Sequence, residues 1–354
     1  MAVLLISTVG CHSLGYYSQA IHGHFQIVCR TTSIKKLLAD PQTPESLKER
    51  FQLVLDLREF AGRELKLPPD GQYLTYADLG RRFAVWNVYA APEFSLKAKT
   101  WWYPFVGSLK YQGYFTDERA RRYAEKLSAK GYDAFVGGVE AYSTLGWFKD
   151  PVLNTFIHND DLDLAELLFH ELAHERVFIS GDTDFNEAFA TAVAEEGVRT
   201  WLKAKGKSSA LEQYEAELRR KQQFVDLVCK TRDRLNDLYD ASRETVPSGR
   251  AAAETQSIAE LRAKKQSVFK DLRQDYQQLK QSWNGDGGYD EWFRQPLNNA
   301  HLNDVDTYYT LVPAFHRILQ SHHGDWEKFY REIEHLGKLS EDARRKKLLG
   351  TDHR

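Results

Sequence analysis

A short stretch in the middle of the chain contains histidines and glutamates whose types and spacing could support metal chemistry. His170, Glu171 and His174 form the pattern H-E-x-x-H, and Asn186-Glu187 follows twelve residues after His174. Residues four apart on a helix project from one face, so both imidazoles can bind one cation while Glu171 lies beside them. The pattern therefore predicts a zinc site of the hydrolase type.

The third ligand of this site is predicted to be Glu187. A catalytic zinc ion takes three protein ligands and keeps one position for water. Gly181 and two aspartates between the motifs have a turn composition, so a second helix can fold back on the first. Glu195 and Glu196 are the alternative third ligands. Glu171 is then the predicted base, which takes a proton from zinc-bound water and passes it to the leaving amine.

A competing interpretation is a solvated helix, because a pattern with three fixed letters also arises by chance. Apolar neighbours favour a buried site instead: Leu167, Leu168, Phe169, Leu172 and Ala173. Glu175 departs from the zinc-helix pattern, which usually has an uncharged residue after the second histidine. Thr191 and Glu195 share the helix face of Glu187 and are candidates to orient a histidine.

Four segments together resemble a bacterial family of zinc aminopeptidases, many of which are predicted lipoproteins: residues 15–20 (GYYSQA), 141–148 (AYSTLGWF), 170–174 (HELAH) and 185–197 (FNEAFATAVAEEG). The resemblance extends from Cys11 to about Phe315. Residues 186–190 are also similar to the N-E-G-F-A segment of the gluzincin aminopeptidases, whose glutamate binds zinc. The resemblance implies a gluzincin-like core, a Zn²⁺ cofactor, a peptide substrate and aminopeptidase specificity.

Composition indicates a globular chain with a substantial core. The chain has 354 residues, of which 42% are hydrophobic, enough for one large or two moderate domains. The 48 basic and 50 acidic side chains nearly balance, which argues against a protein that binds nucleic acid through a basic field. No obligate protein partner is predicted.

Cys11 ends an apolar run that resembles the lipobox of bacterial lipoprotein precursors. Residues 1–11 are therefore predicted to be a lipoprotein signal, with Cys11 lipidated and the protein held in the periplasm by a lipid anchor. The run lacks the basic start of a secretory signal, so the alternatives are a true start further upstream or a buried N-terminal strand, which would favour a cytoplasmic protein. With Cys29 and Cys229, the cysteines are too few for a disulfide scaffold.

The hydrophobic pattern predicts a helix-rich α/β (α+β) fold with a small sheet. Helices are expected at residues 15–30, 43–61 and 116–130, and strands at 82–90, 100–106 and 132–139. The metallopeptidase core is predicted to span residues 12–207. A long, charged, antiparallel helical hairpin is predicted at 208–284, and a C-terminal helical section at 285–354 completes the core.

Other residues are candidates for binding substrate. The segment 137–148 follows a predicted strand and could pair with an extended peptide, or it could be a tight loop whose aromatic residues fill the core. Within it, Glu140 is a candidate to bind a free α-amine. Tyr308, Tyr309 and His301 are candidates to stabilise the oxyanion, although each could equally be structural.

The function predicted from these observations is zinc-dependent peptide-bond hydrolysis, with aminopeptidase specificity implied by the resemblance. An envelope zinc endopeptidase would share every residue named above. A non-catalytic envelope scaffold that retains zinc is the remaining alternative.

Overall fold

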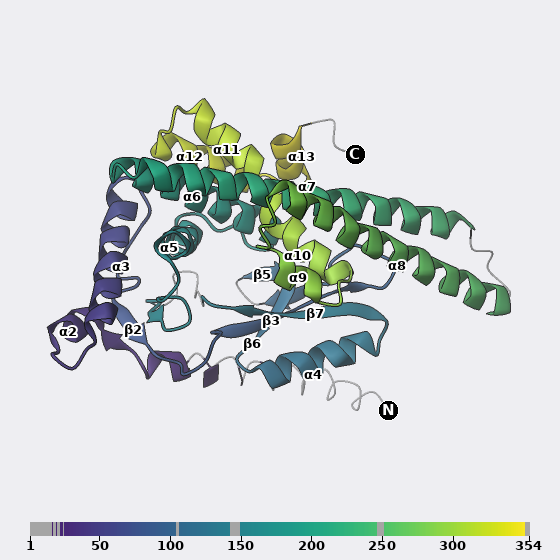
Figure 1. The fold of residues 1–354 in the computed structure, drawn as a ribbon, viewed down its shortest axis with the longest axis horizontal. Helices are drawn as coiled ribbons and strands as arrows, with labels where there is room; N and C mark the ends of the chain where they lie inside the picture. The colour runs from purple at the N-terminus through teal and green to yellow at the C-terminus, as the bar shows by residue number, and fades with distance from the viewer. Residues whose placement is uncertain are drawn as a thin grey trace.

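The computed structural model describes residues 16, 19, 22, 23, 25–103, 106–141, 149–245 and 251–350, with only the backbone of 244–245 and 251–256. The fold is a mixed α/β structure that is mostly helical, as predicted (Figure 1). Three small sheets lie beside and below a group of helices that includes the two expected to carry the metal ligands.

The central sheet has the strand order β6-β3-β7 and is antiparallel throughout. Its strands are β3 (Val85–Pro92), β6 (Tyr111–Tyr114) and β7 (Tyr132–Val139). Helix α4 (Asp117–Ser128) covers one face and helix α10 (Asn299–Tyr309) covers the other (Figure 1). Because both faces are covered, consecutive residues of β3 are buried instead of alternating ones.

Two smaller sheets flank the central one. One joins β1 (Thr32–Ser33), β2 (Thr75–Ala77) and β8 (Val152–Leu153). The other pairs β4 (Trp101–Tyr103) with β5 (Gly107–Leu109). The strand predicted at 100–106 is observed in part, since β4 covers Trp101–Tyr103. Residues 104–105 are not described, and β5 begins at Gly107.

Helices α5 (Asp161–Arg176) and α6 (Thr183–Ala204) pack against each other near the centre of the molecule. The Asp160 side chain caps α5 by accepting hydrogen bonds from the amides of Leu162 and Asp163, both at 2.9 Å. Gly197 allows the helices to approach closely, because a Cβ there would lie 2.7 Å from the Phe169 ring. This contact holds the two segments that carry the predicted ligands together.

The main hydrophobic core surrounds this helix pair. It is completed by α2 (Ile34–Ala39), α3 (Glu45–Arg63), α11 (Val312–Ser321), α12 (Trp326–Gly337) and α13 (Glu341–Leu349). The helix predicted at 43–61 is thus observed as α3, which begins at Glu45. Pro44 is at the N-cap position, and no side chain caps the helix.

The predicted helical hairpin is confirmed as α7 (Ser208–Thr245) and α8 (Ala251–Ser282), which lie side by side and extend away from the core (Figure 1). A second hydrophobic cluster joins the hairpin to α9 (Asp290–Arg294) and α10. The predicted break near Pro247 falls outside the described residues. Within the described part of the chain, no helix is both long enough and apolar enough to cross a bilayer.

Candidate metal centre

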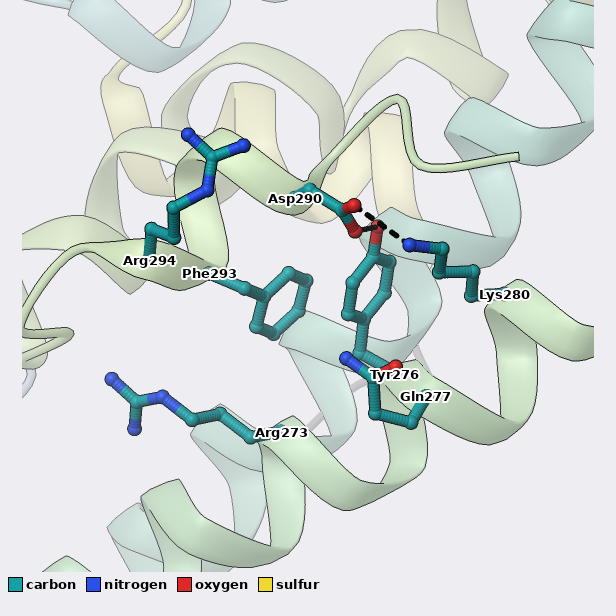
Figure 2. Close-up of a pocket in the computed structure, with 7 residues that line it drawn as sticks. All are labelled: Arg273, Tyr276, Gln277, Lys280, Asp290, Phe293 and Arg294. Carbon is teal, nitrogen blue, oxygen red and sulfur yellow. Dashed lines mark hydrogen bonds and ion pairs between the residues drawn. The ribbon is translucent and has the colours of Figure 1, made fainter. Parts of the chain in front are cut away.

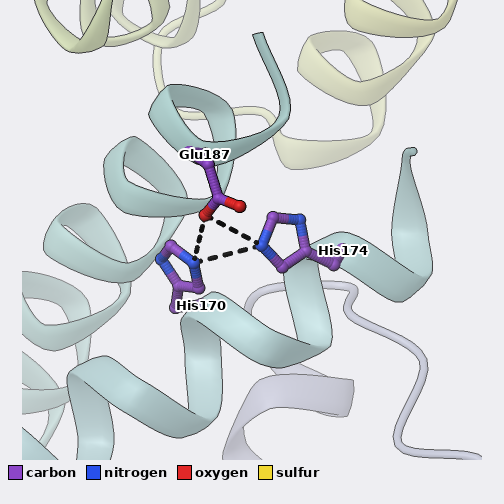
Figure 3. A group of neighbouring side chains, drawn as sticks. All are labelled: His170, His174 and Glu187. Carbon is purple, nitrogen blue, oxygen red and sulfur yellow. Dashed lines mark hydrogen bonds and ion pairs between the residues drawn. The ribbon is translucent and has the colours of Figure 1, made fainter. Parts of the chain in front are cut away.

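One group of side chains, which we call the metal group, lies between α5 and α6 and consists of His170, His174 and Glu187 (Figure 3). Their ligand atoms all lie within 4.8 Å of one another. The two Nε2 atoms are 3.1 Å apart, and Oε2 of Glu187 lies 3.3 Å from Nε2 of His170 and 3.5 Å from Nε2 of His174. His174 and Glu187 are buried, whereas His170 is partly exposed.

The spacing of these three atoms fits one metal ion. Ligand bonds of about 2.0–2.1 Å in a tetrahedral zinc site separate the ligand atoms by about 3.3–3.4 Å. The observed separations of 3.1, 3.3 and 3.5 Å bracket this value. Two imidazoles and one carboxylate are also a common ligand set for catalytic zinc, so the residues fit the ion. Among the described residues this is the group with the composition and closeness to hold a metal.

The loop between the helices explains how Glu187 reaches the histidines. Asn186 accepts a hydrogen bond from the Ile179 amide and donates one to the Ile179 carbonyl, both at 2.8 Å. Gly181 has φ +86°, a conformation that favours glycine, and the Asp182 side chain caps α6 through the Phe185 amide. Asn186 therefore closes the loop, and the next residue, Glu187, points back at α5.

The electrostatics of the group favour an ionised Glu187. Burial raises its pKa, but the charge of His174 and hydrogen bonds from both histidines outweigh burial and lower the pKa to about 2. Burial lowers the pKa of His174, whereas the charge and hydrogen bond of Glu187 and the charge of Glu171 give a net rise. A carboxylate that stays ionised is available as a metal ligand over a wide pH range.

Glu171 lies on α5 beside these ligands and is partly buried. Its charge acts on His174 and on Tyr111, which begins β6, so the carboxyl is close to the metal group. It does not belong to the group of three residues that could hold a metal ion.

Tyr308 lies on α10, and its ring stacks near that of His170, with centroids 6.4 Å apart. Tyr89 from β3 and Tyr111 from β6 also lie close to Glu187. Burial raises the pKa of all three hydroxyls, and the charge of Glu187 raises each one further. All three are therefore hydrogen-bond donors at neutral pH.

Tyr308, Tyr89 and Tyr111 form a wall beside the metal group, and Asp304 is a fourth residue of this wall. Asp304, Tyr89 and Tyr111 were not predicted from the sequence. Burial raises the pKa of Asp304 to about 7, although a hydrogen bond with Tyr89 lowers it, and the charge of Glu187 adds to the rise. The available signal was its position four residues before Tyr308, which places both on one face of α10. No such sequence spacing relates Tyr89 or Tyr111 to the H-E-x-x-H motif.

The alternative ligands Glu195 and Glu196 have other partners. Glu195 binds Nε2 of His316 at 2.8 Å and Lys221 at 3.4 Å, and Glu196 pairs with Arg199 at 3.2 Å. Both line a separate cleft of about 640 Å³. Glu195 also does not orient His174, whose Nδ1 is buried without a hydrogen-bond partner in the described structure. The predictions of Glu195 or Glu196 as the third ligand, and of Glu195 as the residue that orients a metal-binding histidine, are therefore wrong. Both glutamates lie on the side of α6 that faces α7 and α11.

The structure places the three candidates for oxyanion stabilisation, Tyr308, Tyr309 and His301, at three different sites. Tyr309 lines the same separate cleft, with Lys221 over its ring at 5.7 Å. His301 belongs to the capping box of α10, where Nδ1 contacts Asn298 at 3.0 Å and Nε2 contacts Gln295 at 3.3 Å. Burial lowers the pKa of His301 to about 4, and its ring stacks on Phe135. These contacts account for His301 without the metal group, so Tyr308 is the candidate that remains.

Glu140 follows β7 and accepts a hydrogen bond from Nδ2 of Asn159 at 2.8 Å. The rest of the predicted substrate segment, residues 142–148, lies outside the described residues, as does Cys11. The strand-or-loop alternative and the lipidation of Cys11 therefore stay predictions.

A further hollow of about 250 Å³ lies between α8 and α9 (Figure 2). Tyr276 stacks on Phe293 with centroids 3.9 Å apart, and both Tyr276 and Lys280 bind Asp290 at 2.7 Å. These contacts fasten α9 to the hairpin, so the hollow is explained by packing.

The fold and this group define a helix-rich α+β protein with a potential metal centre on an H-E-x-x-H helix. The chain matches the family described as "Putative aminopeptidase" over residues 15–349, and it belongs to this family. No curated protein and no solved structure matches the chain.

Proposed function

We propose that this protein is a zinc-dependent aminopeptidase with a gluzincin-like core. The observation that carries the proposal is the convergence of His170, His174 and Glu187, whose ligand atoms lie within 4.8 Å of one another. Membership of the family described as "Putative aminopeptidase" supports peptide hydrolysis as the reaction.

The residues around the group have matching roles in this proposal. When bound, zinc would polarise the scissile carbonyl and increase the acidity of a water molecule. Glu171 takes the proton of the attacking water and delivers it to the leaving amine. Tyr308, whose hydroxyl stays protonated, donates a hydrogen bond to the oxygen that gains negative charge in the transition state.

The experiment combines metal analysis with two peptide substrates. Purified protein should contain about one zinc ion per chain, and His170→Ala should lose it. Glu171→Gln should keep the metal and lose nearly all activity, because the amide cannot accept the proton. A zinc-free wild type would contradict the metal site, and an active Glu171→Gln variant would contradict the assigned base.

Peptides with free and acetylated N-termini test the aminopeptidase specificity. We expect cleavage of the free peptide alone. Equal cleavage of both would identify an endopeptidase, and cleavage of neither by the zinc-loaded protein would favour a scaffold without catalytic activity.

We also propose a cell-envelope location through a lipid on Cys11. The support is the apolar run before this cysteine, which resembles a lipobox. Labelling with a radioactive fatty acid in a bacterial host should mark the wild type and leave Cys11→Ser unlabelled. An unlabelled wild type would remove this proposal.

A further inference from the structure

We propose that Asp304 binds the free α-ammonium group of the peptide substrate and so selects for unblocked N-termini. The inference rests on the proposed function and adds to it a specificity-determining residue that the sequence motif does not contain. It concerns the wall formed by α10 and β3 beside the metal group.

The geometry of an aminopeptidase substrate restricts where such a residue can lie. The α-nitrogen is attached to the carbon next to the scissile carbonyl, so it is about 2.5 Å from the carbon that is attacked. A carboxylate that recognises this nitrogen must therefore share a small space with the metal ligands and the base. Acidic residues in clefts far from the metal ligands therefore cannot bind this nitrogen.

Asp304 meets this requirement through the packing of α10. This helix lies against α6, which carries Glu187, and against the central strand β3. Tyr308, one turn further along α10, stacks near His170 with ring centroids 6.4 Å apart. The carboxyl of Asp304 interacts with Tyr89 of β3 and is close enough to Glu187 for their charges to affect each other.

Asp304 is also a carboxyl with unused hydrogen-bonding capacity. Its Oδ1 is buried and has no hydrogen-bond partner among the described residues, and the nearby Arg232 pairs with Asp306 instead. A buried acceptor without a partner destabilises the protein, and a donor that reaches it regains that free energy. An α-ammonium group has three N–H donors and a positive charge, so it can bind Asp304 by a charge-assisted hydrogen bond.

Three other acidic residues near α5 and α6 are already paired with basic side chains. Glu195 binds His316 at 2.8 Å, Glu166 binds Lys221 at 2.9 Å, and Asp184 binds Lys110 at 2.6 Å. Their partners compensate the negative charge and occupy the directions that an ammonium group would need. Glu171 and Glu187 have the roles of base and ligand, so they are not free for recognition.

The test compares Asp304→Asn with two matched variants. Asparagine keeps the size of the side chain and an oxygen that can accept from Tyr89, but removes the charge. Asp306→Asn makes the same change on the same helix at a carboxyl whose oxygens are held by Arg232 and Thr310, both at 2.8 Å. Glu140→Gln tests the other candidate for binding the amine.

The first measurement is kcat/KM for a free peptide and for its N-acetylated form. We expect the preference for the free peptide to fall by roughly 100-fold in Asp304→Asn, because losing one partner of a desolvated charge pair commonly costs that much. Asp306→Asn and Glu140→Gln should keep the preference of the wild type. Circular dichroism verifies that each variant is folded.

The second measurement does not depend on turnover. Calorimetry follows the binding of a dipeptide and its N-acetylated form to Glu171→Gln and to the double variant Glu171→Gln/Asp304→Asn. We expect the double variant to bind the free dipeptide roughly 100-fold more weakly and the acetylated one equally well.

The outcomes separate this inference from the proposed function. If the wild type prefers free peptides and Asp304→Asn keeps that preference, Asp304 is not the recognition residue, although the aminopeptidase assignment stands. Loss of the preference in Glu140→Gln alone would assign recognition to Glu140. If the wild type cleaves no peptide, the proposed function fails. Equal binding of the free dipeptide to both Glu171→Gln proteins would then overturn the inference independently.

Discussion

At the scale of single residues, Glu175 is a carboxyl where zinc helices usually have an uncharged side chain. Burial raises its pKa from 4.5 to about 7, opposed by a hydrogen bond from Gln72 and reinforced by the charge of Asp150. Between these two values the folded protein binds more protons than the unfolded chain. The contribution of Glu175 to stability is therefore greatest at low pH and falls as the pH rises from about 4.5 to about 7.

Glu175→Gln should remove this dependence. We expect the variant to be more stable than the wild type at pH 8 by about 1–2 kcal/mol, after allowing for partial solvent exposure, with little difference at pH 4.5. Urea unfolding at both pH values measures the difference. A variant that is less stable at pH 8 would mean that the ionised carboxyl has a favourable partner.

Tyr308 and Tyr309 are adjacent in the chain but face different sites, so they form a matched pair. Tyr308→Phe should lower kcat by about 100-fold or more, the usual cost of removing an oxyanion donor, without changing the zinc content. Tyr309→Phe should leave kcat within about 3-fold of the wild type, because its ring lines the separate cleft with Lys221. Equal effects of the two substitutions on kcat would contradict the role assigned to Tyr308.

At the scale of secondary-structure elements, α13 fastens the start of the helix that carries Glu187. Arg344 is only 4% exposed and binds Oδ2 of Asp182 through Nε at 2.8 Å. It also donates to the carbonyls of Gly337 and Leu339 and lies over the ring of Phe185. The N-cap of α6 is therefore held by a residue more than 150 positions away in the chain.

Arg344→Met should reduce the free energy of unfolding by about 3–5 kcal/mol, because it leaves the charge of Asp182 buried and unpaired. Arg345→Met is the control. Arg345 is exposed and reaches Asp184 only at 3.6 Å, so its loss should cost at most about 1 kcal/mol. Denaturant unfolding measures the free energy of unfolding of both variants. Equal losses would mean that the buried pair stabilises the protein no more than the exposed pair.

At the scale of the whole molecule, the metal group lies between two helices of the main hydrophobic core. Buried apolar residues of α5 and α6 pack with those of α3, α11 and α12 in one continuous cluster. The hairpin has a second cluster of its own with α9 and α10. The apolar contacts that hold the two ligand helices together are therefore expected to remain when the metal is removed.

Chelation of the zinc-loaded protein should lower the thermal midpoint while the helical circular dichroism at 25 °C stays unchanged. Binding at a free zinc concentration of 100 Kd contributes about 2.7 kcal/mol, which corresponds to roughly 4 °C for a chain of this size. Glu187→Gln, which weakens the site, should show a smaller shift. Loss of helical signal on chelation would mean that the metal is needed to form the core.

The sequence by itself determined the parts of this protein that depend on local spacing. The two histidines, the helix that carries them and the long hairpin follow from helical periodicity, and Glu187 follows from a turn composition between two helical segments. Tertiary structure alone decided which distant residues join them. Tyr89, Tyr111 and Asp304 come from three separate elements, and no spacing rule relates them to the motif. Adjacent residues on a helix point about 100° apart. Only the packing of α10 against α6 therefore decides that Tyr308, and not Tyr309, faces the metal group.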